Sequence, residues 1–214
     1  MPGRLDEIPS DLSPSRLVAA YSSGAFPMPD PDDPSEILWF SPDPRALLPL
    51  DERFHVSRRL ARTLRQGRLT CTVDRAFTAV MLGCRQREEG SWISDDFLAA
   101  YGRLHELGLA HSVEAWADED RCGDPAGGVY GVTLGGAFFA ESMFHRQTDA
   151  GKVALVHLVE CLRRDGFVLC DVQWLTPNLK RFGACEISRA EYMLQLAGAL
   201  AARVRFLIRD GALF

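Results

Sequence analysis

Apolar residues recur at helical spacing in several stretches of the chain, and most of these stretches follow a capping residue. Ser13 before Pro14, Ser57, Asp74, Asp95 and the capping box Ser188 to Glu191 are the start signals. Gly24 and Gly108 are stop signals. Helices are therefore predicted over residues 14–23, 58–66, 75–87, 96–107 and 150–165, with a short one after Thr176 and a last one after Ser188.

Extended segments occupy the middle of the chain. Residues 111–117, 127–134 and 137–144 follow one another with short connections, which is the pattern of a β-meander. Two further strands are expected, at residues 68–73 and 167–173. Because helices and strands alternate irregularly, the order favours an α+β sheet with helices on its faces.

The segment from Phe26 to Leu50 contains seven prolines between Pro27 and Pro49. Such a stretch cannot form a long regular element, because proline lacks a backbone donor and fixes φ. We expect it to connect a small N-terminal domain, residues 1–50, to a main domain, residues 51–214, with the boundary near residues 45–55.

The composition is that of an ordinary globular protein: 214 residues, 47% apolar and 25% charged, enough for a sizeable core. No segment has the length and apolarity of a membrane span or a signal peptide, so we expect a cytoplasmic protein that does not bind membranes. No two cysteines have C-x-x-C spacing, and we expect reduced core residues. They are Cys71, Cys84, Cys122, Cys161, Cys170 and Cys185.

Positive charge is concentrated between residues 53 and 70, although the whole chain has a formal net charge of −5. This stretch contains six arginines and no acidic residue: Arg53, Arg58, Arg59, Arg62, Arg65 and Arg68. A helix would place Arg58, Arg62 and Arg65 on one face. The cluster is either a solvated helix face or a surface for a nucleic acid.

Several common chemistries lack their sequence pattern. His105 and His111 are six residues apart, whereas a helical zinc site needs two histidines four apart, so no metal is expected. The glycine-rich segment 123–136 lacks the lysine of a phosphate-binding loop, and Ser142 lacks the G-x-S-x-G context of a nucleophile. We expect neither a cofactor nor a covalent intermediate.

Polar residues interrupt two apolar strands. Asp171 and Gln173 are two residues apart, so a strand would project them from the same face, and Glu141 interrupts the segment AFFAESMF. Each could be a core polar group satisfied by local hydrogen bonds. Because burying two acids and an amide is unfavourable, the set is also a candidate catalytic site.

The chain resembles the bacterial leucyl/phenylalanyl-tRNA-protein transferases from about Asp11 to Leu196. Ten segments carry the resemblance in the same order and spacing: LSPSRLVAAYSSGAFP, ILWFSPDPRALLPL, FHVSRRL, REEGSWI, AYGRLHELGLAHSVEAW, GGVYGV, ESMF, KVAL, DVQ and FGACEISRAEY. The resemblance implies a small N-terminal domain and a GNAT-like acyltransferase domain with a mixed, largely antiparallel sheet flanked by helices. It also implies transfer of Leu or Phe from aminoacyl-tRNA to proteins with N-terminal Arg or Lys, by direct attack of the amine on the aminoacyl ester. The products would be substrates of N-degron proteolysis.

The resemblance also implies residue roles. Asp171 and Gln173 would lie at the amine and its proton, with Glu141 orienting an α-amine or the cationic end of the acceptor. The aminoacyl side chain and terminal adenosine would contact Met28, Trp92, Val129, Phe138 and Met143, although apolar strand residues are more often core. The tRNA would bind the arginine cluster at Arg58, Arg59, Arg62, Arg65 and Arg68.

Four departures from the family pattern bear on specificity. The family has tryptophan where this chain has Met28, a second aromatic is here Phe40, SK is here Gly151-Lys152, and HL is here Asn178-Leu179. The preferred amino acid is therefore open, with Met as a third candidate donor. Two alternatives from other classes are an acyl-CoA-dependent N-acyltransferase and a non-catalytic tRNA-binding protein.

Overall fold

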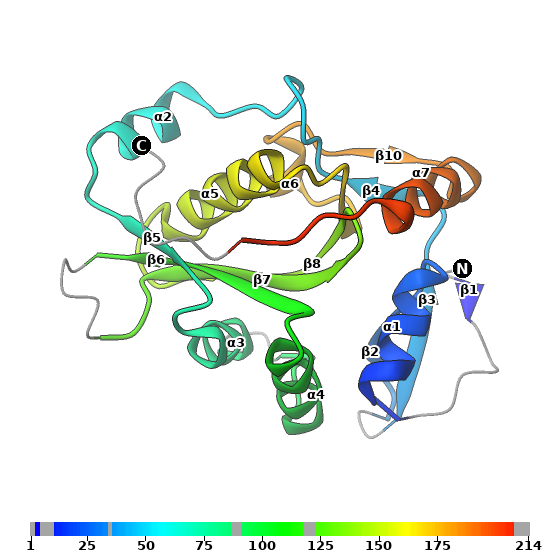
Figure 1. Cartoon of the computed structure of the whole chain (residues 1–214). Helices are drawn as coiled ribbons and strands as arrows, with labels where there is room; N and C mark the ends of the chain where they lie inside the picture. Colours follow the sequence, from blue (N-terminus) through cyan, green and yellow to red (C-terminus); the bar gives the residue numbers. More distant parts are fainter. Residues whose placement is uncertain (1–2, 5–10, 34–35, 87–90, 118–122, 208–214) are drawn as a thin grey trace.

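Two β-sheets organise the protein in a computed structural model that describes residues 3–4, 11–33, 36–86, 91–117 and 123–207 (Figure 1). A three-stranded sheet has the order β1-β3-β2, and a seven-stranded sheet has the order β10-β4-β9-β8-β7-β6-β5. The strands are β1 (Gly3–Arg4), β2 (Phe26–Pro29), β3 (Ile37–Ser41), β4 (Arg45–Leu47), β5 (Thr70–Val73), β6 (Ala110–Trp116), β7 (Gly127–Leu134), β8 (Ala137–His145), β9 (Leu169–Gln173) and β10 (Cys185–Ile187).

Helices flank the larger sheet on both faces, with α3 and α4 on one face and α5 on the other (Figure 1). The helices are α1 (Pro14–Ser22), α2 (Arg58–Arg65), α3 (Phe77–Arg85), α4 (Asp95–Glu106), α5 (Ala150–Asp165), α6 (Pro177–Lys180) and α7 (Arg189–Ala201). Each face buries its own core. Tyr130 and Phe139 lie in the core shared with α1, α3, α4 and α7, whereas Val129 and Phe138 lie in the core shared with α5. The predicted mixed α+β sheet flanked by helices is confirmed.

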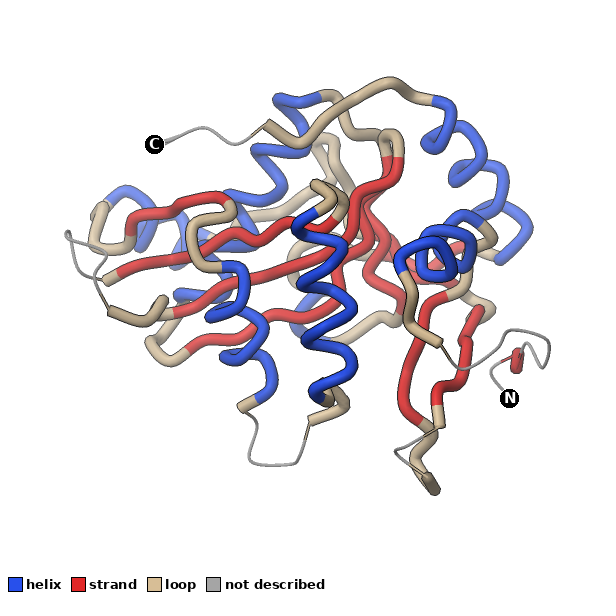
Figure 2. The backbone as a smooth tube through the Cα atoms, turned by 60° about the horizontal axis from the view of Figure 1, so that its bottom comes forward, coloured by secondary structure: helices blue, strands red, loops and turns tan. Residues whose placement is uncertain are grey.

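The predicted meander is formed by β6, β7 and β8, which pair antiparallel. Helices lie on both faces of the larger sheet (Figure 2), and α5 packs on the face opposite to α3 and α4. After α5 the chain returns as β9, which pairs parallel to β8. The other strand pairs of the larger sheet are antiparallel. This parallel pairing places the carboxyl ends of β8 and β9 side by side.

Two of the predicted helix caps are wrong. Asp74 does not cap α3: it has φ +56° and accepts hydrogen bonds from the Ser112 N–H at 2.7 Å and, in the corresponding tautomer, from His111 Nδ1 at 2.6 Å. The helix starts only at Phe77, and its predicted end at residue 87 lies outside the described residues. Helix α4 is capped by Ser94, whose Oγ accepts the Phe97 N–H, while Asp95 lies in the first turn. A carboxylate there still favours the helix through the dipole.

The proline-rich segment forms no long element, as expected, but it does contain three short strands. β2 includes Pro27 and Pro29, which is possible because β2 is an edge strand that needs donors on one side only. β4 pairs with β9 and β10 in the larger sheet, although it precedes residue 50. The division of the chain near residue 50 stays a prediction.

Four cysteines are buried in the core as expected, namely Cys71, Cys84, Cys161 and Cys170. The expectation is wrong for Cys185, which is exposed on the edge strand β10, and Cys122 lies outside the described residues. Among the helices described, none is long and apolar enough to cross a membrane.

Candidate active site

A β-bulge in β8 gives Glu141 its position. Tyr130 pairs with Ser142 and the next residue, Gly131, pairs with Ala140, so Glu141 is an extra residue without a partner in the ladder. The bulge keeps Ala140 and Met143 on the α5 face, three residues apart, while Phe144 stays on the opposite face. The Glu141 side chain therefore falls outside the regular alternation of side chains along β8. It lies just after the part of β8 that pairs parallel with β9.

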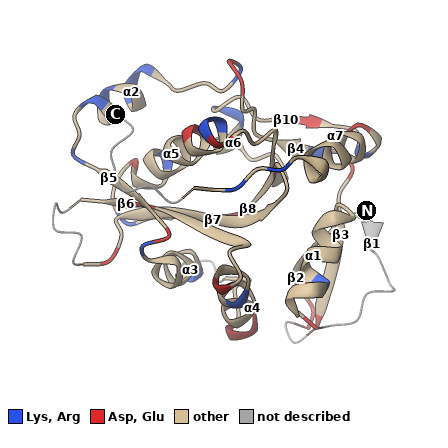
Figure 3. Cartoon of the chain, viewed as in Figure 1, with Lys and Arg blue, Asp and Glu red and all other residues tan. Residues whose placement is uncertain are grey.

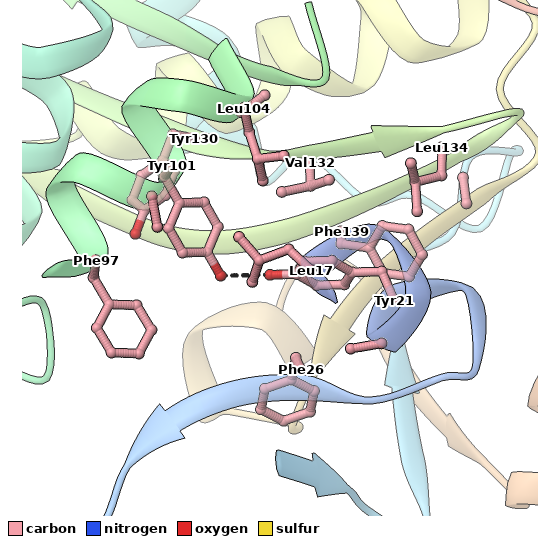
Figure 4. Packing of buried hydrophobic residues seen from close by; sticks show 14 of the residues in the cluster. Leu17, Tyr21, Phe26, Phe97, Tyr101, Leu104, Tyr130, Val132, Leu134 and Phe139 are labelled. Atoms are coloured by element: carbon pink, nitrogen blue, oxygen red, sulfur yellow. Dashed lines mark hydrogen bonds between the residues drawn. The ribbon is translucent and has the colours of Figure 1, made fainter. Parts of the chain in front are cut away.

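Two tyrosine hydroxyls, from α1 and α4, contact the Glu141 carboxylate, and the amide of Gln173 is a third contact. The hydroxyl of Tyr21, on α1, donates to Oε1 at 2.7 Å, and the hydroxyl of Tyr101, on α4, donates to Oε2 at 3.2 Å. The two hydroxyls also lie 2.5 Å apart, and Figure 4 shows the two phenols pointing toward each other. Burial raises the pKa of Glu141 to about 7, against the opposing effect of the tyrosine hydrogen bonds. At neutral pH this carboxyl is poised between its two protonation states.

Gln173 completes this network from an unusual backbone conformation. Its Nε2 donates to Glu141 Oε1 at 3.3 Å. Its φ is +58°, and the Trp174 N–H donates to the Val172 carbonyl at 2.7 Å, so Gln173 is the central residue of a γ-turn. A non-glycine residue rarely adopts this conformation, and such residues cluster at functional sites.

Asp171 lies behind Gln173 and forms a buried ion pair. Its carboxylate accepts from Arg45 Nε at 2.9 Å and from Arg45 Nη2 at 2.7 Å, and neither side chain is more than 1% exposed. Tyr192, on α7, donates its hydroxyl to Asp171 Oδ2 at 2.7 Å. Asp171 Oδ1 also accepts the backbone N–H of Gln173 at 2.9 Å. Each oxygen of the Asp171 carboxylate thus accepts hydrogen bonds from neighbouring protein groups.

A cavity of about 320 Å³ opens where β8 and β9 cease to pair. Among the described residues, the last parallel partners are Phe139 and Asp171, and the cavity is lined by residues that directly follow them on each strand. The wall is mostly apolar, and Glu141 and Gln173 contribute polar groups to it. The lining residues are Phe26, Met28, Trp92, Val129, Ala140, Glu141, Ser142, Met143, Leu155, Val172, Gln173, Trp174, Thr176, Asn178 and Leu179.

The structure brings most of the predicted apolar contacts to this cavity. Met28, Trp92, Val129 and Met143 all line it. Phe138 does not: it is 1% exposed and packs in the α5 core against Phe206, because its side chain projects from β8 before the bulge. Of the predicted polar set, Glu141 and Gln173 line the cavity, whereas Asp171 is 0% exposed and contacts the cavity wall through the backbone of Gln173.

The predicted basic residues lie on and beside α2, where Figure 3 shows a concentration of Lys and Arg. All five are exposed: Arg58, Arg59, Arg62, Arg65 and Arg68. The Arg59 guanidinium also lies 3.5 Å from Asp149, at the start of α5. Among the described residues, this helix therefore presents a basic surface on the α5 side of the sheet.

Four polar residues of the site were not predicted, namely Tyr21, Arg45, Tyr101 and Tyr192. Their partners are between 21 and 126 positions away in sequence, so no local spacing connects them. One signal was present for Arg45, which precedes the apolar run ALLPL. The criterion that selected Glu141, a charge beside an apolar strand, also selects this arginine.

A pocket that is largely apolar, with a few converging polar groups and a carboxyl of raised pKa, is typical of the site of an enzyme. Two family models together match most of the chain: residues 10–43 match the leucyl/phenylalanyl-tRNA protein transferase N-terminal domain, and residues 47–197 match the leucyl/phenylalanyl-tRNA protein transferase family. The chain belongs to this family, as the ten segments predicted.

Two curated relatives with the same description are similar over nearly their full length. The leucyl/phenylalanyl-tRNA--protein transferase of Herpetosiphon aurantiacus is 51% identical over 195 residues, which is 91% of this chain and 98% of that protein. The one from Akkermansia muciniphila is 48% identical over 191 residues, covering 88% of this chain and 96% of that protein. A more distant likeness is to a solved structure of L-PGS from Bacillus licheniformis, with 11% identity and a TM-score of 0.42 over 89% of this chain and 71% of that chain.

Proposed function

We propose that this protein transfers leucine or phenylalanine from aminoacyl-tRNA to the N-terminal Arg or Lys of acceptor proteins. Membership of the family makes it an aminoacyl-tRNA-dependent aminoacyltransferase. The observation that carries the more specific proposal is the cavity, in which apolar side chains surround Glu141 and Gln173. An apolar amino acid esterified to tRNA would find both a place for its side chain and polar groups for its amine.

The chemistry requires alignment more than activation. The acceptor α-amine has a reference pKa of about 7.7 to 8.0 and is partly neutral near pH 7. Its nitrogen attacks the ester carbonyl, a C–N bond forms, the ester C–O bond breaks, and one proton passes from nitrogen to the departing ribose oxygen. Holding the two reactants together is worth up to roughly 7 to 11 kcal/mol in ideal cases.

Each part of the site then has a role in the proposal. Gln173, which lines the cavity, orients the attacking amine, and Glu141, which contacts Gln173, orients the α-amine of the aminoacyl group. Asp171 holds Gln173 rather than contacting the substrate. Met28, Val129 and Met143 contact the aminoacyl side chain.

Two surfaces extend the proposal beyond the cavity centre. Trp92 lies at the wall of the cavity and stacks on the terminal adenosine. The exposed arginines of α2 bind the acceptor arm through its phosphates, since such contacts come largely from Arg and Lys. We further propose a GNAT-like fold for the larger sheet, supported by the parallel pair β8–β9 and the crossover α5. The reaction would take place in the cytoplasm and mark acceptors for N-degron proteolysis.

The test is a transfer reaction analysed by mass spectrometry. The protein is incubated with Leu-, Phe- or Met-tRNA and with peptides that begin with Arg, Lys or Ala. We expect the mass of one leucyl or phenylalanyl residue to be added to the Arg and Lys peptides and none to the Ala peptide. Gln173→Ala serves as the weakened variant, with a loss of about a hundredfold or more. Absence of transfer to any peptide would contradict the proposal.

A further inference from the structure

We propose that Arg45 is a positioning residue of the transfer reaction, which acts through Asp171 to hold the strained turn at Gln173. The inference rests on the proposed function, because it assigns a role within the same site. Arg45 does not line the cavity, and its guanidinium is 1% exposed. Its effect on the reaction therefore passes through the residues that it contacts and through its positive charge, which also acts on Glu141 and which Arg45→Lys retains.

The contact between Arg45 and the turn passes through one oxygen atom. Asp171 Oδ1 accepts from Arg45 Nε at 2.9 Å and from the backbone N–H of Gln173, also at 2.9 Å. The other oxygen, Oδ2, accepts from Arg45 Nη2 and from the Tyr192 hydroxyl, each at 2.7 Å. The planar fork of the guanidinium fixes the rotation of the carboxylate, so that Oδ1 points at the N–H of Gln173.

The guanidinium is itself held on several sides. Its carbon lies 4.8 Å from the centre of the Phe26 ring, on β2, and 4.7 Å from the centre of the Tyr192 ring, on α7. Nη1 donates to the Gly24 carbonyl at 3.0 Å, just before β2. Arg45 thus connects β9 both to α7 and to the strand that brings Met28 to the cavity.

The backbone of Gln173 explains why such an anchor is needed. A residue with φ +58° is at a conformational disadvantage and persists only where its surroundings enforce it. Buried ion pairs are weak contributors to stability compared with apolar side chains of the same volume, but their geometry is directional. We infer that this pair serves the orientation of Gln173, whose amide faces Glu141.

The experiment is a double-mutant cycle between Arg45→Lys and Gln173→Ala, with steady-state kcat and KM for aminoacyl-tRNA as readouts. Lysine keeps the positive charge beside Asp171 but cannot form the fork and the Gly24 bond together. We expect Arg45→Lys to lower kcat by about thirtyfold, since small misplacement of a reacting group costs up to 10²-fold, while KM changes less than about twofold. In the Gln173→Ala background we expect Arg45→Lys to lower kcat by less than about twofold.

A matched control is available elsewhere in the chain. Arg164 forms a comparable fork with Asp165, through Nε at 2.7 Å and Nη2 at 2.9 Å, at the end of α5. Arg164→Lys is expected to leave kcat unchanged. The inference would be overturned if Arg45→Lys lowered kcat by the same factor with and without Gln173, or if it left kcat unchanged. In either case, transfer by the unaltered protein would still support the proposed function. No transfer by the unaltered protein would overturn both.

Tyr192→Phe keeps the inference testable if Arg45→Lys does not fold. This variant retains the ring beside the guanidinium and removes only the hydroxyl that contacts Asp171. We expect kcat to fall by about fivefold in the unaltered background, within the range for one lost hydrogen bond, and not at all in Gln173→Ala. An equal fall in both backgrounds would overturn the positioning role.

Discussion

The hydroxyl oxygen of Tyr21 lies 2.7 Å from Glu141 Oε1, although the two residues are 120 positions apart in the chain. Tyr21 belongs to α1, in the part of the chain matched by the N-terminal family model, whereas Glu141 belongs to the larger sheet. The packing that brings α1 to the sheet is apolar, with the Tyr21 ring centre 4.8 Å from that of Phe139 (Figure 4). The N-terminal helix therefore completes the environment of the carboxyl.

Tyr21→Phe removes one donor from Glu141 and leaves the apolar packing intact. Because the Tyr21 hydrogen bond lowers the pKa of Glu141, its loss should raise that pKa above 7. Loss of a buried hydrogen bond costs about 1 kcal/mol, so Tm should fall by about 2 to 4 °C. Thermal unfolding at pH 7 measures the fall, and an unchanged Tm would show that this hydrogen bond contributes nothing to stability.

Glu141→Gln should change the pH dependence of stability. Below about pH 4.5 Glu141 is protonated in both the folded and the unfolded state. Between pH 4.5 and 7 the unfolded chain loses this proton while the folded protein retains it, so this group makes the folded protein less stable as pH rises. Glutamine carries no such penalty. The Tm of the variant minus that of the unaltered protein should therefore be larger at pH 8 than at pH 5, and a constant difference would contradict the raised pKa.

Reversing Arg58 and Arg62 to Glu should weaken tRNA binding and flatten its dependence on salt, because fewer counterions are released. Both side chains are exposed on α2. The matched control reverses Arg85 and Arg103, which lie on α3 and α4 across the sheet and change the net charge equally. Binding is measured against salt concentration for each. Equal slopes for the two double variants would refute a specific role for α2.

Met28→Trp should alter the ratio of Leu to Phe transfer. Met28 lines the cavity from β2, and an indole there would occupy space that a flexible thioether leaves adaptable. Discrimination between apolar side chains rests on about 1 to 3 kcal/mol per methylene, so such a change can reorder donor preferences. The ratio of kcat/KM for the two aminoacyl-tRNAs measures the effect. A lower or higher Tm with an unchanged ratio would instead assign Met28 to packing between the two sheets.

Gly131→Ala should destabilise the protein strongly. An added Cβ would overlap the Phe139 carbonyl oxygen and lie 2.6 Å from the Phe138 ring, beside the β8 bulge. Overpacking of this kind costs about 1 to 3 kcal/mol or more. The control is Gly102→Ala, on α4, where the new Cβ would meet no atom within 4 Å and should stabilise the helix by about 0.5 to 1 kcal/mol. Denaturant unfolding measures both, and equal stability of the two variants would contradict the packing.

The regular elements were predictable because their signals are local. Helix α5 is predicted with the bounds that the structure has, and Ser57 caps α2 as expected. The sequence could not show that Asp74 fails to cap α3, because the carboxylate binds Ser112 and His111, which lie 37 or more positions away. Residues distant in sequence compete with the nearby backbone for the hydrogen bonds of a side chain, and the folded structure decides which of them it binds.

The candidate site was predictable only in part, for the same reason. Asp171, Gln173 and Glu141 stand out as polar residues in apolar strands, and the structure joins them in one network. That Asp171 would be enclosed by Arg45 and not line the cavity depends on β4 lying beside β9. The phenols of the network are aromatic residues in helices, which the sequence pattern does not distinguish from core.

The bulge at Glu141 separates this cavity residue from the scaffold that carries it. Because Glu141 is the one extra residue between paired neighbours, a chain from which it was deleted would place Ala140, Met143 and Phe144 on the same faces as now and would close the β7–β8 ladder without interruption. Loss of the site would then leave the architecture intact. A one-residue difference in length could thus divide active members of such a lineage from inactive ones with the same shape.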